Sequence, residues 1–488
     1  MKEADSVELP TVGSGSEART RRQIFVSVAI ILAVMALILF AVPRPEGIKP
    51  EGWRLLAIFA GTILALMLRP LPGGAAVLLG ITAIIATGTL PLGKALSGYS
   101  DSNAWLILAA FFIGRGLIKA GLARRIALYF VRRIGHTSLG LAYSVIFSDV
   151  VLACVIPSNA ARSGGVILPI TRSLAEIYNS YPGATSGLLG TFLMLALHQG
   201  DTVACALFLT GQASNPIGAD IAAKMAHLPI DWPRWLWVAL LPGLVSLIVV
   251  PWAVFRLAKP GIVHTPEAAE FGRKELEAMG PRTLQENITL VIFLAVCGLW
   301  ITGRYHSLAT TTVALMGVSA LLATGVLTWR EAAAEHGAWD VFIWYGGVLM
   351  MATALNDFGI TTEFARRVSG LFPGWNWFWV LLLIALIYFY AHYAFASITS
   401  HVVSMYPPFL AALLALGAPP GPTVFLLLFF SNLSAGLTNY GTTPAAIIFG
   451  TGYVTHGLWW KIGFLISLVN IAIWLTVGMA WWKIIGLF

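Results

Sequence analysis

Two short polar segments within apolar regions carry the residues best suited to bind a small anion. They are Ser158–Arg162 and Ser397–His401. In each, a basic side chain follows a serine by four residues, about one helical turn, so the two side chains share a face. Arginine can bind a carboxylate through two parallel hydrogen bonds, and histidine changes charge near neutral pH. The two segments predict a site for a small di- or tricarboxylate, with one carboxylate held at each.

Each polar segment is followed by an apolar stretch that Gly, Ser/Thr and Pro interrupt, at 211–218 and at 440–444. Helix N-termini at such breaks present backbone N–H groups that favour anions. The predicted substrate-binding residues are therefore Ser158, Asn159, Arg162, Ser397, Thr399, His401, Ser214, Asn215, Thr442 and Thr443.

Ionisable residues at membrane depth are costly and suggest function by default. Asp149 fits a structural acid as well as an ion site, and His198 with Asp201 fits a buried pair as well as a proton relay or a wall of the site. Two alternatives stay open for the basic residues: Arg162 reaching the cytoplasmic face, and His401 as a hydrogen-bonded core residue.

Composition identifies a membrane protein. Of 488 residues, 58% are apolar and 11% charged, against about 25% charged in soluble chains. This excludes a soluble enzyme, a disordered protein and a nucleic-acid binder. Cys154, Cys205 and Cys297 show no CxxC spacing, so neither a disulfide scaffold nor a zinc site is indicated. No phosphate loop or metalloprotease motif occurs, and no cofactor is expected.

Spanning helices need about 20 mostly apolar residues. Eleven stretches qualify: about 23–42, 52–68, 73–90, 104–122, 186–225 (interrupted), 234–257, 286–302, 308–327, 338–356, 422–455 (interrupted) and 458–485. Two more, about 137–176 and 376–410, are broken midway by the polar segments. Such breaks must lie against protein or water, so we expect two re-entrant hairpins, here the first and second hairpin.

Lys and Arg in short loops predict the orientation. The polar tail 1–22 carries four of them, which places the N-terminus in the cytoplasm. The span count then also places the basic region 115–133 and the connection 259–284 in the cytoplasm. We expect a multi-pass protein of a bacterial-type inner membrane.

The two halves resemble each other weakly at an offset of about 238 residues. After the first span and loop, 23–50, the predicted repeats are 51–258 and 285–488, joined by 259–284, and the span count gives them opposite orientations. Inverted repeats with paired discontinuous helices are typical of secondary transporters whose site lies between the repeats.

Three segments resemble the divalent anion/sodium symporter family: Ile156–Gly165, Ala394–His401 and Asn432–Pro444. The pattern is most similar to its exchanger branch, which includes citrate/succinate, tartrate/succinate and plastid 2-oxoglutarate/malate antiporters. The resemblance implies a homodimer in which each protomer has a scaffold domain and a transport domain that slides as an elevator. Sodium-coupled members carry a Ser-Asn-Thr triplet at each hairpin tip. Here Ile398 replaces the second amide, which leaves Ser158 and Asn159 as the residues that could contribute to a sodium site.

The function expected is sodium-independent exchange of di- or tricarboxylates, such as succinate, malate, 2-oxoglutarate, tartrate or citrate. The alternative is a sodium- or proton-coupled carboxylate symporter of the same fold. A membrane enzyme would need a nucleophile and base or a metal cluster, which these segments lack. Saturable stimulation by substrate on the far side would exclude an anion channel.

Overall fold

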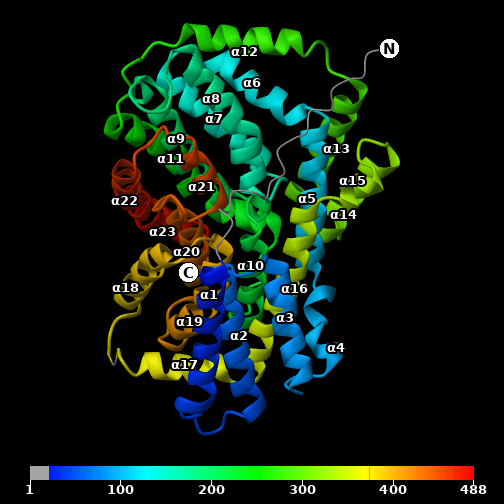
Figure 1. Ribbon diagram of the computed structural model, residues 1–488, viewed down its shortest axis with the longest axis vertical. Coiled ribbons are helices and arrows are strands. Elements are labelled where there is room, and N and C mark those ends of the chain that lie inside the picture. Colours follow the sequence, from blue (N-terminus) through cyan, green and yellow to red (C-terminus); the bar gives the residue numbers. More distant parts are fainter. Residues whose placement is uncertain (1–20, 373) are drawn as a thin grey trace.

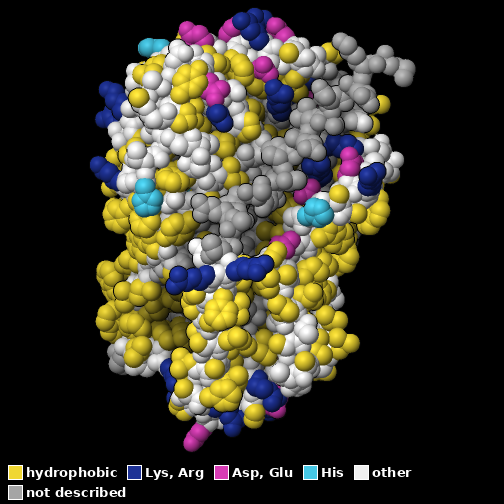
Figure 2. Space-filling view, viewed as in Figure 1, with side chains coloured by type: hydrophobic (Ala, Val, Ile, Leu, Met, Phe, Trp, Pro, Cys, Tyr) yellow, Lys and Arg dark blue, Asp and Glu magenta, His cyan; other side chains and the backbone are white. Residues whose placement is uncertain are grey.

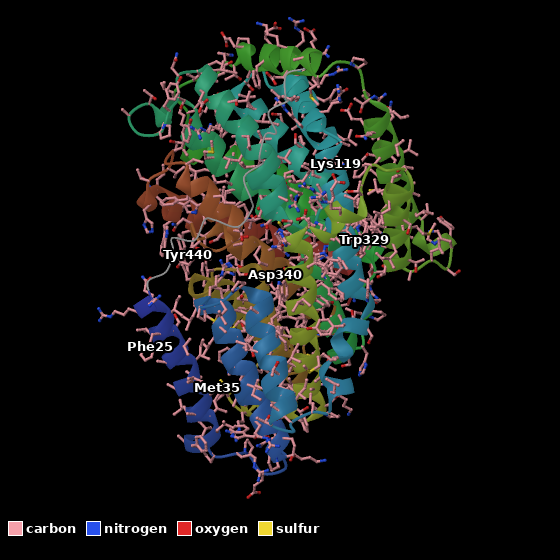
Figure 3. All side chains as sticks on the ribbon, turned by 45° about the vertical axis from the view of Figure 1, so that its right-hand side comes forward. Phe25, Met35, Lys119, Trp329, Asp340 and Tyr440 are labelled. Carbon is pink, nitrogen blue, oxygen red and sulfur yellow. The ribbon has the colours of Figure 1, made fainter. Side chains whose placement is uncertain are left out.

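The structure, a computed structural model, describes residues 21–372 and 374–488 as a bundle of helices (Figure 1). These residues form no β-strand, so the all-α prediction is confirmed. Most of the predicted tail 1–22 lies outside the described residues. Figure 2 shows a largely hydrophobic lower half, whereas charged side chains gather at the top over α12 (Pro266–Ala278). On α1 (Arg21–Ala36), Phe25 points away from the bundle and is 74% exposed (Figure 3).

In the described part, eight helices are long and apolar enough to cross a membrane, and nine if one bent pair counts as a single span. The eight are Arg21–Ala41, Pro50–Leu68, Trp232–Leu257, Leu284–Ile301, His336–Asp357, Trp377–Ala394, Ile398–Ala415 and His456–Ile484. The stretches expected at 73–90 and 308–327 form helices of 14 residues each. The arms of the second hairpin are long enough to span by themselves, so length alone does not separate a hairpin from two spans.

One order of helices occurs twice along the chain. The first series is α2 (Pro50–Leu68), α3 (Gly73–Ala86), α5 (Ser102–Lys119), α6 (Leu122–Ile134), α7 (Ser138–Ala153), α8 (Leu168–Ile177), α9 (Gly190–Leu207), α10 (Ser214–Met225) and α11 (Trp232–Leu257). The second is α13 (Leu284–Ile301), α14 (Thr310–Ala323), α16 (His336–Asp357), α17 (Ile360–Ser369), α18 (Trp377–Tyr390), α19 (Ile398–Ala415), α20 (Pro420–Leu433), α21 (Thr443–Gly450) and α22 (His456–Ile473). The series interlock, because α14 packs on α5 and α3 packs on α16.

Matching glycines turn the chain at the same place in each series. Gly121 (φ +83°) precedes α6, and Gly359 (φ +75°) precedes α17. These left-handed conformations suit glycine because it has no Cβ. The turn at Gly121 bends α6 away from α5 by 65°. Both helices after the glycines are amphipathic, and they lead into the two hairpins.

Four of the six basic residues in the region 115–133 pair with acids that are distant in sequence. The pairs are Arg115–Glu335 at 3.8 Å, Lys119–Glu331 at 2.7 Å, Arg124–Glu275 at 2.6 Å and Arg125–Glu286 at 2.6 Å. Lys119, labelled in Figure 3, reaches the short helix α15 (Trp329–Ala333) that begins with the labelled Trp329. The sequence alone could not predict these pairs, because every partner lies more than a hundred residues away.

Candidate functional site

The first tip, Ser158–Arg162, begins a helix inside the protein. The chain leaves α7 at Ala153 and resumes in a π-helical turn at Ala160–Ile167, which continues into α8. Ser158 Oγ accepts a hydrogen bond from the Ala161 backbone N–H at 3.2 Å. Such a contact satisfies an N–H group that has no partner within the helix. Ser158 stays partly exposed, whereas Asn159 is 5% exposed.

Arg162 is fully buried and contacts two carboxylates. Its Nε lies 3.0 Å from Asp149 Oδ1, and its second terminal nitrogen lies 3.3 Å from Asp201 Oδ1. The other terminal nitrogen donates to the carbonyls of Ile156 and Gly211, at 2.6 and 2.7 Å. Arg162 therefore joins the first hairpin to α9 and to the break that follows α9.

The hydrogen-bond donors of Arg162 point at groups of the protein itself. A guanidinium has five N–H donors, and here Asp149, Asp201, two carbonyls and the Cys205 thiol, 3.4 Å away, accept from them. A direct bidentate clamp on substrate would break these bonds. Arg162 also has no exposed surface, and the carboxylates of Asp149 and Asp201 compensate its charge. Asp201, in turn, pairs with Arg162, whereas His198 packs against the ring of Trp459.

Asn159 connects the first tip to the second half of the chain. Its Nδ2 lies 3.0 Å from Thr442 Oγ1 and 3.3 Å from Asp201 Oδ2. Thr442 immediately precedes α21, the helix that begins after the second break. Two segments that are 283 residues apart in sequence thus meet at one buried amide.

The second tip, Ser397–His401, is built in the same way. Ser397 Oγ accepts from the Ser400 N–H at 3.4 Å and caps α19. Ser397 and Thr399 are partly exposed, whereas His401 is fully buried. His401 Nε2 contacts the Tyr388 carbonyl at 2.9 Å, on the other arm of its hairpin. Like Arg162, this residue joins the two arms of its own hairpin.

His392 links the second tip to the second break. Its Nε2 contacts the Gly441 carbonyl at 2.9 Å, and its ring lies edge-on to that of His401 with centroids 5.0 Å apart. Gly441 is next to Thr442, so a continuous chain of contacts leads from Arg162 through Asn159 to His401. Sequence analysis missed the Gly441 carbonyl as a partner, since no sequence signal marks a backbone acceptor.

The two broken spans also meet. Asn215 Nδ2 donates to the carbonyls of Cys205 and Phe208, at 2.8 and 2.9 Å, where α9 ends. Asn215 Oδ1 accepts from Asn432 Nδ2 at 2.9 Å, near the end of α20. Asn432 went unnoticed in the sequence, although it opens a segment used for the resemblance. Asn215 therefore has a structural role at the breaks.

The remaining predicted residues differ in exposure. Ser214 is fully buried and Thr442 is 4% exposed, while Thr443 is exposed at the start of α21.

Sequence analysis also missed Arg69, which has φ +46° and donates to the Ala396 carbonyl at 3.0 Å beside the second tip. A cavity of about 330 Å³ lies behind the first hairpin, between α6, α8 and Phe271 of α12, and its lining does not include the tip residues. In the described residues, no three His, Cys, Asp or Glu side chains form a group that could hold a metal ion.

Comparison with known proteins gives matches over nearly the whole chain. Residues 22–488 match the family model of the sodium:sulfate symporter transmembrane region. The chain is 43% identical over 454 residues to dicarboxylate transporter 1, chloroplastic, of Arabidopsis thaliana, covering 92% of this chain and 82% of that protein. It is 32% identical over 475 residues to the L-tartrate/succinate antiporter of Escherichia coli O157:H7, covering 93% and 97%.

A similar fold occurs in MtrF of Neisseria gonorrhoeae, which belongs to a class of antimetabolite efflux pumps. The TM-score is 0.56 over 94% of both chains, at 14% sequence identity. At this identity the likeness concerns the fold alone.

Proposed function

Because this chain belongs to the sodium:sulfate symporter family of membrane transporters, we propose that it exchanges small di- or tricarboxylates across the membrane without sodium. The observation that carries the proposal is the meeting of the first hairpin tip with the second break through Asn159 and Thr442, 3.0 Å apart. The relatives named above, a dicarboxylate transporter and a tartrate/succinate antiporter, support the substrate class. Succinate, malate, 2-oxoglutarate, tartrate and citrate are the candidate substrates.

In this proposal the substrate lies between the tips. The partly exposed hydroxyls of Ser158, Ser397 and Thr399 and the exposed Thr443 donate to its carboxylates. The N-termini of α10 and α21, at Ser214 and Thr443, add positive potential. Asn159, Asn215 and Thr442 hold the surrounding backbone, while Arg162 and His401 fasten the hairpins behind it.

Exchange follows from the same donors. An empty site leaves hydroxyls and helix N-termini without acceptors, and unpaired polar groups are costly away from water. A bound carboxylate removes that cost, so we propose that the site crosses the membrane mainly when loaded. The absence of an amide at Ile398 favours a cycle without sodium. A homodimeric elevator with a cytoplasmic N-terminus in an inner membrane completes the proposal.

The test uses labelled succinate and proteoliposomes preloaded with one candidate carboxylate at a time. We expect internal dicarboxylates to stimulate uptake and internal acetate not to, equally with sodium or potassium outside. A sodium-dependent rate, or one that needs a pH gradient instead of internal substrate, would replace antiport by symport. Uptake that no internal carboxylate stimulates would contradict exchange.

A further inference from the structure

The charges around Arg162 do not balance if both neighbouring acids are ionised. Asp149, Arg162 and Asp201 all have no exposed surface. Two carboxylates and one guanidinium would leave one net negative charge in the interior, which is strongly unfavourable. No other Lys, Arg, Asp or Glu side chain of the described residues forms an ion pair with these three.

The hydrogen bonds show the same imbalance. Asp149 Oδ1 accepts from Arg162, but Asp149 Oδ2 is buried and accepts from no donor. Asp149 and Asp201 flank the same guanidinium, at 3.0 and 3.3 Å, so their carboxyl groups lie close together. Two carboxylates repel, whereas a carboxylic acid donates a hydrogen bond to a carboxylate. One proton therefore satisfies both the charge and the unpaired oxygen.

We propose that Asp149, Arg162 and Asp201 form a proton-binding site that holds one proton, carried by Asp201. Asp149 is the ionised partner because its contact with the guanidinium is shorter, 3.0 against 3.3 Å. Asp201 keeps a contact with Asn159, at 3.3 Å, through its other oxygen. The other titratable groups facing Arg162 are the thiols of Cys205 on α9 and of Cys154 at the end of α7, beside Cys297 of α13.

The consequence for transport rests on the proposed exchange function. With its proton the cluster is neutral, so the first hairpin carries no net charge of its own and only the substrate contributes charge. Loss of the proton would place a negative charge behind the tip that receives a carboxylate. Exchange should then slow as the pH rises far enough to deprotonate Asp201.

Infrared difference spectroscopy tests the site without requiring transport. The carbonyl band of a protonated carboxylic acid is distinct from the bands of a carboxylate. The purified wild type minus Asp201→Asn spectrum should contain this band at neutral pH, and Asp201→Glu should shift it. Glu363 on α17, partly exposed and paired with Arg366 and Arg367, gives the control: Glu363→Gln should remove carboxylate bands alone.

Absence of the protonated band from the wild type would overturn the proposal. Loss of the band in Asp149→Asn but not in Asp201→Asn would equally overturn it. If Asp201→Asn does not fold, two other measurements test whether Asp201 carries the proton. They are the shift of the band in Asp201→Glu and the pH at which the wild-type band disappears. In transport, Asp149→Asn should lose at least about tenfold more exchange than Asp201→Asn, because it removes the ionised partner of a buried arginine. An inactive protein with the band intact would contradict the transport function and leave the proton site standing.

Discussion

Arg162 Nε and Asp149 Oδ1 are 3.0 Å apart, and neither side chain has exposed surface. The contact joins the two arms of one hairpin, because Asp149 lies on α7 and Arg162 lies after the tip. Arg162 thus fixes the tip through its own hairpin before any substrate arrives. Its terminal nitrogen donates to the backbone carbonyls of Ile156 and Gly211, next to the segments proposed to hold a carboxylate.

Substitution of Arg162 should separate folding from transport. Arg162→Ala leaves two buried acids without their cation and should lower the free energy of unfolding by about 3–5 kcal/mol. Arg162→Lys keeps the charge but has three donors in place of five, so it should fold and lose at least about tenfold in exchange. Thermal unfolding and exchange rates measure both effects.

The matched control is Arg172→Ala on the same hairpin, since Arg172 is exposed and pairs with Glu176 at 2.8 Å. Arg172→Ala should change neither the thermal stability nor the exchange rate. Wild-type thermal stability in Arg162→Ala would show that the buried ion pairs do not support the fold.

Asn159 and Thr442 should act as one unit. Asn159→Ala removes a buried link between the two halves and should reduce exchange about tenfold, the effect of a lost buried hydrogen bond. Thr442→Ala should do the same, and the double variant should lose no more than either alone. Asn376→Ala, at the exposed cap of α18, serves as the control. Additive losses would mean that the two side chains act separately.

Much of the fold could be predicted from the sequence because it follows from hydropathy and helix breakers. The polar tips at Ser158 and Ser397 and the glycines Gly121 and Gly359 mark turns that the structure contains. The partners of the tips could not be predicted in this way. Arg162 and Asp201 are 39 residues apart, and Asn159 and Thr442 are 283 apart. Hydropathy identifies polar residues at membrane depth but not which of them meet.

The division into inverted repeats stays a prediction, although helices recur in one order. The proposed elevator movement of the hairpins can be tested with two cysteines. Cys154, at the end of α7, lies close to Cys297 on α13. If the first hairpin slides past α13, bridging these thiols with mercuric ion should stop exchange, and excess thiol should restore it.

Cys297→Ser should be insensitive to mercuric ion, and it retains Cys205 as an internal control. Full exchange by bridged wild-type protein would rule out movement between the first hairpin and α13.

The ion pair Lys119–Glu331 predicts a pH dependence outside the membrane. Burial alone would raise the pKa of Glu331, but hydrogen bonds from Lys119 and Thr328 outweigh it and lower the pKa to about 2. A lowered carboxyl pKa stabilises the fold above the unfolded value, about 4.3, and this stability is lost as the pH falls toward 2. Glu331→Gln should therefore lower the melting temperature at neutral pH and converge with the wild type in acid.

The pair is nearly a third exposed, with side chains 28% and 29% accessible, so its effect should be about 1 kcal/mol or less. A double-mutant cycle with Lys119→Met isolates the contribution of this ion pair to the free energy of unfolding. A Glu331→Gln deficit that persists unchanged at low pH would contradict the assignment to this ion pair.

The central claim is exchange of a dicarboxylate without sodium. The most direct measurement is the initial rate of labelled succinate uptake into sodium-free proteoliposomes, with and without internal unlabelled succinate. We expect at least about a tenfold higher rate into preloaded vesicles, equivalent to about 1.4 kcal/mol in favour of the loaded site crossing the membrane. Equal rates into loaded and empty vesicles, or no uptake until sodium is added, would contradict the account.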